Sequence, residues 1–125
     1  MGGDAAAGPP FPPGADAEGY VVVAQRADVP PGALLRVLYG DEAVLLANVD
    51  GQVYALADDC LHAGAMLSEG LLRAGAVICP WHAWRYDAAT GAVLLPRGTG
   101  LCTTTYAVRV DGEAIAVGPR RPRGE

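Results

Sequence analysis

Hydrophobic positions in this chain come in short runs separated by residues that favour turns. The runs are three to six residues long, contain many Val, Leu and Ala, and are bounded by Gly, Pro and Asp. This pattern is typical of β-strands, and no segment repeats its apolar residues with a helical period over a useful length. The predicted strands are Tyr20–Ala24, Leu34–Leu38, Ala43–Asn48, Gln52–Ala57, Val77–Cys79, Arg85–Asp87, Ala92–Leu95, Thr105–Val110 and Glu113–Val117.

Several of these strands are predicted to form hairpins. Asp50-Gly51 and Asp111-Gly112 each separate two strands, and this dipeptide favours two-residue hairpin turns. Residues 88–91, which end in Gly91, predict a further turn. Many short strands joined by tight turns indicate an all-β fold, a sandwich or a barrel.

The two ends of the chain differ in composition from the rest. Residues 1–19 are mostly Gly, Ala and Pro, which favours an extended and disordered tail. Residues 119–125 contain three arginines and are predicted to be a basic, solvated tail. We therefore expect one domain over residues 20–118.

Charge and hydropathy exclude two classes of partner. The formal net charge is −5 and the chain shows no basic stripe, which argues against nucleic-acid binding and fits docking on a basic partner surface. No apolar run reaches the roughly eighteen residues that a membrane-spanning helix needs. With no recognisable secretory signal, we expect a cytoplasmic location, where thiols stay reduced.

The chemistry of the chain is concentrated in two short motifs. Cys60-Leu61-His62 is followed, after sixteen residues, by Cys79-Pro80-Trp81-His82, and these motifs contain both histidines and two of the three cysteines. Thiolates and imidazoles grouped in this way predict a metal site gripped by two loops. Zinc remains an alternative, because Cys₂His₂ is a common structural zinc set, although zinc sites more often pair Cys with Cys and His with His. The third cysteine, Cys102, is expected to be a small buried residue near a strand.

The two motifs and their surroundings resemble the Rieske iron–sulfur family. The similarity covers most of residues 21–117 and includes the strand and hairpin before Cys60, both ligand loops, Thr90-Gly91 and Pro96. It implies the Rieske iron–sulfur fold, an antiparallel β-sandwich with a cluster-binding subdomain formed by two loops. It also implies one [2Fe–2S] cluster, with the two cysteines of the motifs on one iron and the two histidines on the other.

The resemblance also implies roles for residues around the cluster. Tyr86 matches a tyrosine that donates a hydrogen bond to a ligand thiolate, and Gly64 and Trp84 are expected to lie directly around the cluster ligands. Ala65 and Trp81 stand where respiratory members carry a loop disulfide, and Trp84 stands where they carry a serine donor. Fewer donors predict a reduction potential near the low end of the Rieske range, roughly −150 mV rather than +300 mV.

Exposed residues near the ligands are candidates for partner binding. Leu61, Trp81 and Pro96 are expected either to form an apolar docking patch or to pack over the cluster. For Trp84 packing is the favoured interpretation. Asp58 and Asp59 are expected to solvate a loop rather than to contact a partner.

The family resemblance implies that this chain is a ferredoxin, an electron carrier with no substrate site of its own. A flavin-dependent reductase using NAD(P)H would supply the electron, and a terminal oxygenase would receive it. The chain itself is not expected to be the oxygenase, because oxygenase chemistry needs histidines beyond the two assigned to the cluster. We expect the free protein to be a monomer. The alternatives are a small subunit of a nitrite-reductase-like complex and a zinc-stabilised binding module.

Overall fold

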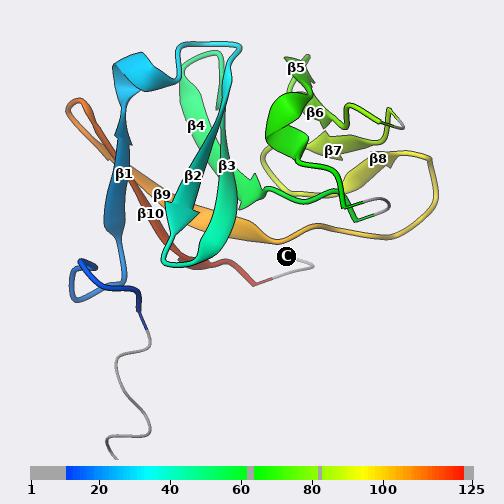
Figure 1. Cartoon of the computed structure of the whole chain (residues 1–125). Helices are drawn as coiled ribbons and strands as arrows, with labels where there is room; N and C mark the ends of the chain where they lie inside the picture. Colours follow the sequence, from blue (N-terminus) through cyan, green and yellow to red (C-terminus); the bar gives the residue numbers. More distant parts are fainter. Residues whose placement is uncertain (1–10, 62–63, 82, 123–125) are drawn as a thin grey trace, which may run out of the picture.

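The computed structural model describes residues 11–61, 64–81 and 83–122 of the chain. Within these ranges the elements are short strands and two 3₁₀ helices (Figure 1). In order they are β1 (Val21–Gln25), η1 (Arg26–Asp28), β2 (Leu34–Tyr39), β3 (Glu42–Val49), β4 (Gln52–Ala57), η2 (Leu67–Glu69), β5 (Leu71–Arg73), β6 (Ala76–Ile78), β7 (Arg85–Asp87), β8 (Val93–Leu95), β9 (Thr105–Asp111) and β10 (Ala114–Arg120).

The strands form two antiparallel sheets that lie side by side (Figure 1). The larger sheet has the order β1-β10-β9-β4-β3-β2, and its two edge strands contact each other, so the sheet curls toward a closed barrel. The smaller sheet has the order β5-β6-β7-β8 and is inserted in the sequence between β4 and β9. The prediction of an all-β, antiparallel fold is confirmed.

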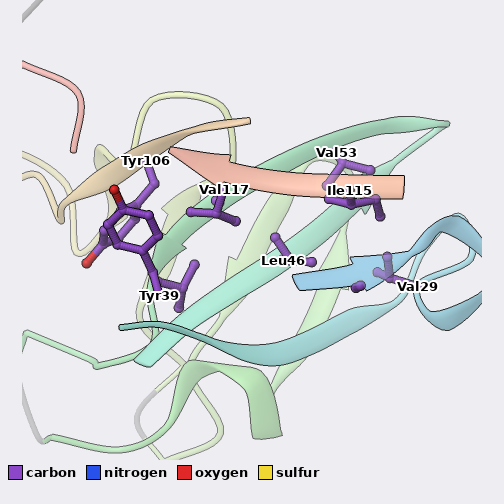
Figure 2. Packing of buried hydrophobic residues seen from close by; sticks show 10 residues of the cluster. Val29, Tyr39, Leu46, Val53, Tyr106, Ile115 and Val117 are labelled. Atoms are coloured by element: carbon purple, nitrogen blue, oxygen red, sulfur yellow. The ribbon is translucent and has the colours of Figure 1, made fainter. Parts of the chain in front are cut away.

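Strand β3 lies between two hydrophobic cores and contributes side chains to both. Val44 and Leu46 face the core inside the larger sheet. Figure 2 shows this core, in which Leu46 packs with Val29, Val53, Ile115 and Val117. Leu45 and Ala47, which alternate with Val44 and Leu46, face the core between the two sheets. A strand buried on both faces needs apolar side chains at every position, and this explains the uninterrupted run in residues 43–47.

The hairpin predicted at Asp50-Gly51 is confirmed. Val49 pairs with Gln52, and the two turn residues have φ of 52° and 99°, as a turn of type I′ requires. The prediction at Asp111-Gly112 is wrong by one residue, because Asp111 pairs with Ala114. The turn is therefore Gly112-Glu113, with the positive φ at its first position, where a type II′ turn takes glycine.

All nine predicted strands are present, but sequence analysis missed β5. Arg73 pairs with Ala76, which leaves Ala74-Gly75 as a two-residue turn with φ of 53° and 79°. Alanine rarely adopts this left-handed conformation, so Ala74-Gly75 is not a recognised hairpin dipeptide, although Gly75 stands directly before β6. The three-residue strand itself is too short to show a pattern.

Residues 11–19, which sequence analysis grouped with the N-terminal tail, contact the larger sheet. The Asp16 carboxylate accepts hydrogen bonds from the backbone N–H groups of Glu18 and Tyr20 and forms an ion pair with Arg109. The Tyr39 hydroxyl donates to the Gly19 carbonyl over 2.8 Å. In the described part of the chain, no helix is long and apolar enough to cross a membrane.

Candidate metal centre

Cys60 and Cys79 both lie at the junction between the two sheets. Cys60 follows β4 by three residues, and Cys79 comes directly after β6. Both thiols are buried, and neither forms a disulfide. They belong to the same hydrophobic core, together with Leu56, Val77 and Tyr86. Two segments separated by eighteen residues are thus brought together at one point.

Each cysteine begins a tight loop that is closed by the same kind of hydrogen bond. The Cys60 N–H donates to the Ala65 carbonyl, and the Cys79 N–H donates to the Trp84 carbonyl, both over 2.8 Å. In the first loop the Gly64 N–H also donates to the Cys60 carbonyl over 2.9 Å, and Gly64 has a φ of 70°. Both loops are therefore closed in the same way, by a hydrogen bond from the cysteine N–H to the carbonyl of the residue five positions later.

Tyr86 connects the first loop to the smaller sheet. Its hydroxyl lies 3.3 Å from the Cys60 Sγ and accepts a hydrogen bond from the Leu61 N–H over 2.9 Å. Because the Leu61 amide occupies an acceptor site of the oxygen, the hydroxyl proton is free to be donated to sulfur. Burial, followed by the hydrogen bond with Cys60, raises the pKa of Tyr86 well above its ordinary value. The hydroxyl therefore remains a donor throughout the physiological range.

Asp58 holds the two ends of the first loop together. Its buried carboxylate accepts hydrogen bonds from the Ser68 N–H over 2.7 Å and from the Ser68 Oγ over 2.6 Å. A third bond comes from the Arg36 Nη1 over 2.8 Å. The expectation that Asp58 solvates a loop is wrong, because its side chain is fully buried. Asp59, by contrast, is exposed.

Sequence reasoning missed this carboxylate because its partners are distant in the chain. Arg36 lies in β2 and Ser68 in η2, twenty-two and ten residues away. The sequence does place an acidic residue, Asp58, two positions before Cys60 and a serine, Ser68, after the loop. Only the folded loop brings these two side chains into contact.

The other residues expected near the site occupy different environments. Trp84 is half-buried, packs against the core that contains the cysteines, and has its ring centroid 6.5 Å from that of Tyr86. Gly64, Leu61, Trp81 and Pro96 are exposed. Packing of Trp84 over the site thus agrees with the geometry, and Trp81, 62% exposed, faces solvent.

Cys102 stands apart from the two loops. It forms an isolated bridge with Ala92, and its Sγ donates to the carbonyl oxygens of Thr90 and Thr103 over 3.3 and 3.4 Å. The side chain is half-buried rather than fully buried. His62 and His82 lie outside the described residues.

The chemistry of the donor set fits a thiolate-bound iron–sulfur centre. Two buried thiols outside any disulfide are suited to a soft metal, and both lie close enough to Tyr86 to affect its pKa electrostatically. A buried hydroxyl aimed at one sulfur supplies the hydrogen bond that stabilises negative charge there.

Comparison with known proteins places this site in a family. The family model described as the Rieske [2Fe–2S] domain matches residues 19–105. The chain is 42% identical over 93 residues to the 3-phenylpropionate/cinnamic acid dioxygenase ferredoxin subunit of Escherichia coli (strain K12), covering 73% of this chain and 85% of the relative.

Solved structures agree with the sequence match. The ferredoxin of carbazole 1,9a-dioxygenase from Nocardioides aromaticivorans IC177 is 34% identical, with a TM-score of 0.74 and coverage of 80% of this chain and 97% of that one. A chain from a complex of reduced oxygenase and oxidized ferredoxin in carbazole 1,9a-dioxygenase is 26% identical, with a TM-score of 0.75 and coverage of 83% and 97%. With the family model matched over most of the chain, this protein belongs to the Rieske [2Fe–2S] family.

Proposed function

We propose that this chain is the ferredoxin component of a multicomponent aromatic-ring dioxygenase, a one-electron carrier rather than a catalytic subunit. The observation that carries the proposal is the match to a dioxygenase ferredoxin subunit over almost three quarters of the chain. The paired, buried thiols of Cys60 and Cys79 supply the chemistry that such a carrier needs.

The four residues of the two motifs would hold the cluster. The thiolates of Cys60 and Cys79 would bind one iron, and the imidazoles of His62 and His82 would bind the other. When bound, the cluster takes up and releases one electron. The protein's own part is to keep water from the sulfurs and to hold the loops, and the hydroxyl of Tyr86 directs a proton at the Cys60 Sγ.

The partners follow from the same proposal. A flavin-dependent reductase using NAD(P)H would deliver the electron, and a terminal oxygenase would receive it. A ferredoxin similar to this chain has been captured in a complex with its oxygenase. Exposed Leu61 and Trp81, with Pro96, are candidates for contact with these partners. We also propose that the free protein is a monomer in the cytoplasm.

The ligand assignment is tested by spectroscopy of the purified protein. After reduction with dithionite, the EPR spectrum should show the signal of a [2Fe–2S] cluster with mixed His and Cys ligation. Exchange of either histidine, His62→Cys or His82→Cys, should shift the potential or abolish the cluster, while Cys102→Ser should leave the spectrum intact. A colourless protein that contains zinc would disprove the cluster, and unchanged spectra and potentials in both histidine variants would disprove the ligands.

The role as carrier is tested by reconstitution. The reductase and oxygenase of the E. coli 3-phenylpropionate dioxygenase, combined with NADH and substrate, should depend on a ferredoxin for oxygen consumption. Addition of this chain should restore oxygen consumption at least in part, and a cluster-free Cys60→Ser variant should not. Failure of the purified protein to undergo reversible one-electron reduction would contradict the proposal whatever the reconstitution gives.

A further inference from the structure

Exposed apolar side chains gather in the part of the chain that carries the smaller sheet. Ten large hydrophobic side chains are exposed among the described residues, and seven of them lie between residues 60 and 102. Exposed apolar surface that concentrates in one region indicates an interaction site. The seven are Leu61, Met66, Leu71, Trp81, Leu94, Leu95 and Leu101.

The strand register arranges part of this surface as a continuous row. Leu71 of β5 pairs with Ile78 of β6, Ile78 pairs with Arg85 of β7, and Arg85 pairs with Leu95 of β8. Directly paired residues lie on the same face of a sheet, so these four side chains form one row across all four strands. We call Leu71, Ile78, Arg85 and Leu95 the outer row.

The outer row faces away from the core. Successive side chains of a strand point to opposite faces, and the neighbours of the row in β5, β6 and β7 are Leu72, Val77 and Tyr86. In β8 the register with β7 shifts, so that Val93 pairs with Tyr86 while Leu95 pairs with Arg85. Leu72, Val77, Tyr86 and Val93 belong to the core that contains the two cysteines or pack against it. The outer row is therefore the solvent side of the sheet that supports the metal centre.

The row also lies at the end of the sheet that joins the second ligand loop. Ile78 immediately precedes Cys79, and Arg85 immediately follows Trp84, whose carbonyl closes the loop. The exposed Trp81 projects from the same loop. A partner seated on the row is thus adjacent to the loop through which an electron would leave.

Arg85 gives the row its charge. Among the residues that the structure describes, Arg36, Arg109 and Arg120 form ion pairs, but no carboxylate lies within ion-pair distance of Arg85. The nearest acidic side chain on its own strand, Asp87, accepts hydrogen bonds from the backbone and hydroxyl of Thr90 instead. An exposed guanidinium set in an apolar row is a favourable partner for a carboxylate, which it can bind in bidentate fashion.

Charges beside the row have both signs. Arg97 follows Pro96 directly after β8 and is exposed, while Glu69 precedes β5 and is exposed as well. A further basic residue, Arg73, is exposed in β5 two positions after Leu71 and on the same face, so basic residues lie at both ends of the row.

We propose that the outer row binds the terminal oxygenase, and that the oxygenase surface presents a carboxylate to Arg85 within an apolar rim. The proposal rests on the proposed function as an electron carrier. It differs from the expectation drawn from the net charge of −5, that the chain docks on a basic surface, because Arg85 makes the docking row locally cationic.

The local charge is measured by the oxidation rate of the reduced protein with two small acceptors of opposite charge, ferricyanide and hexaamminecobalt(III), at low ionic strength. Arg85→Glu should slow oxidation by ferricyanide about threefold or more and speed oxidation by the cobalt complex. Arg26→Glu is the matched control. Arg26 is also exposed and has no ion pair with any of the described residues. It lies in η1, beside β1 and away from the smaller sheet (Figure 1). Equal effects of the two variants on both acceptors would overturn the proposal.

The apolar part of the row is tested with a protein acceptor. With the E. coli 3-phenylpropionate dioxygenase oxygenase as probe, Leu71→Ser and Arg85→Glu should each raise the concentration of this chain needed for half-maximal electron delivery, and Arg26→Glu should not. The variants must keep the wild-type EPR spectrum and potential. Absence of the cluster signal in the wild-type protein would defeat the proposed function, whereas an intact signal with equal responses at positions 85 and 26 would defeat only the docking row.

Discussion

Single hydrogen bonds around Cys60 determine how the site can stabilise charge. The Tyr86 hydroxyl accepts from the Leu61 N–H and lies within hydrogen-bond distance of the Cys60 sulfur. The amide therefore orients the hydroxyl toward sulfur. The presence of this tyrosine is readable in the sequence, but the orienting amide of Leu61 is a contact that only the folded loop makes.

Replacement of this tyrosine should lower the reduction potential. In Tyr86→Phe the ring still fills the core, but the sulfur loses a donor that stabilises the extra negative charge of the reduced state. If the differential strength of the bond is about 1 kcal/mol, the potential should fall by roughly 40 mV, since 59 mV corresponds to a tenfold change for one electron. Protein-film voltammetry measures the shift. A potential equal to that of the wild type would show that the hydroxyl does not donate to the sulfur.

The carboxylate of Asp58 should control how firmly the first loop is held. Asp58→Ala removes the acceptor for Ser68 and Arg36, and loss of such buried bonds costs about 1–3 kcal/mol. We expect a lower free energy of unfolding and faster loss of the visible absorption of the cluster. The matched control is Asp59→Ala, whose side chain is exposed. Equal bleaching rates in the two variants would mean that the hydrogen bonds of Asp58 with Ser68 and Arg36 do not hold the loop.

Among the elements, the hairpins show how turn chemistry and strand register combine. Asp50-Gly51 forms the turn that its sequence predicts, whereas the register of β9 with β10 moves the second turn from Asp111-Gly112 to Gly112-Glu113. The partner strand thus decides which two residues occupy a turn. The β5–β6 hairpin is the extreme case, because its turn begins with alanine.

Relief of the strained alanine in this hairpin should stabilise the protein. Ala74 has a φ of 53°, a conformation that costs a residue with a side chain roughly 1–2 kcal/mol. Glycine removes this cost, but its greater flexibility in the unfolded chain offsets part of the gain in stability. Ala74→Gly should therefore raise the free energy of unfolding by about 0.5–1 kcal/mol in urea denaturation. Ala27→Gly, at an exposed position of η1, should lower it. A loss of stability in Ala74→Gly would show that the turn is not strained.

At the scale of the whole molecule, polar contacts close the larger sheet. The Tyr106 hydroxyl of β9 donates to the Glu42 Oε1 over 2.7 Å, and Arg120 of β10 donates to the same oxygen. Together these contacts tie the β2–β3 hairpin to the other half of the sheet. The two partners hold the pKa of Glu42 below its ordinary value of 4.5, with the bond to Tyr106 as the first cause.

The stability of the sheet should therefore depend on pH at both extremes. A carboxyl with a lowered pKa contributes stability that is present above about pH 4.5 and is lost as the pH falls through its folded value. Burial raises the pKa of Tyr106 to about 12, so its contribution is lost as the pH rises from about 10 to 12. Glu42→Gln should flatten the acid limb of a plot of melting temperature against pH. An acid limb as steep as that of the wild type would show that other groups control it.

The sequence by itself determined the all-β class and every strand except β5, and it predicted the pair of metal-binding loops. These features depend on local physics: side-chain alternation, turn residues and the spacing of ligands in two short motifs. The spacing of the two motifs pointed to Cys60 and Cys79, whereas the family resemblance pointed to Tyr86. The apolar run of residues 43–48 predicted a strand, but not the two cores that β3 separates.

Only the tertiary structure decided which distant residues meet. The register between strands accounts for three features. These are the contacts of Asp58 with Arg36 and Ser68, the shifted turn at Gly112, and the outer row with Arg85 at its centre. Register depends on the simultaneous burial of many side chains, so no short segment encodes it. For the same reason the net charge predicted a basic partner, whereas the fold gathers apolar side chains around Arg85, for which the described residues supply no ion pair.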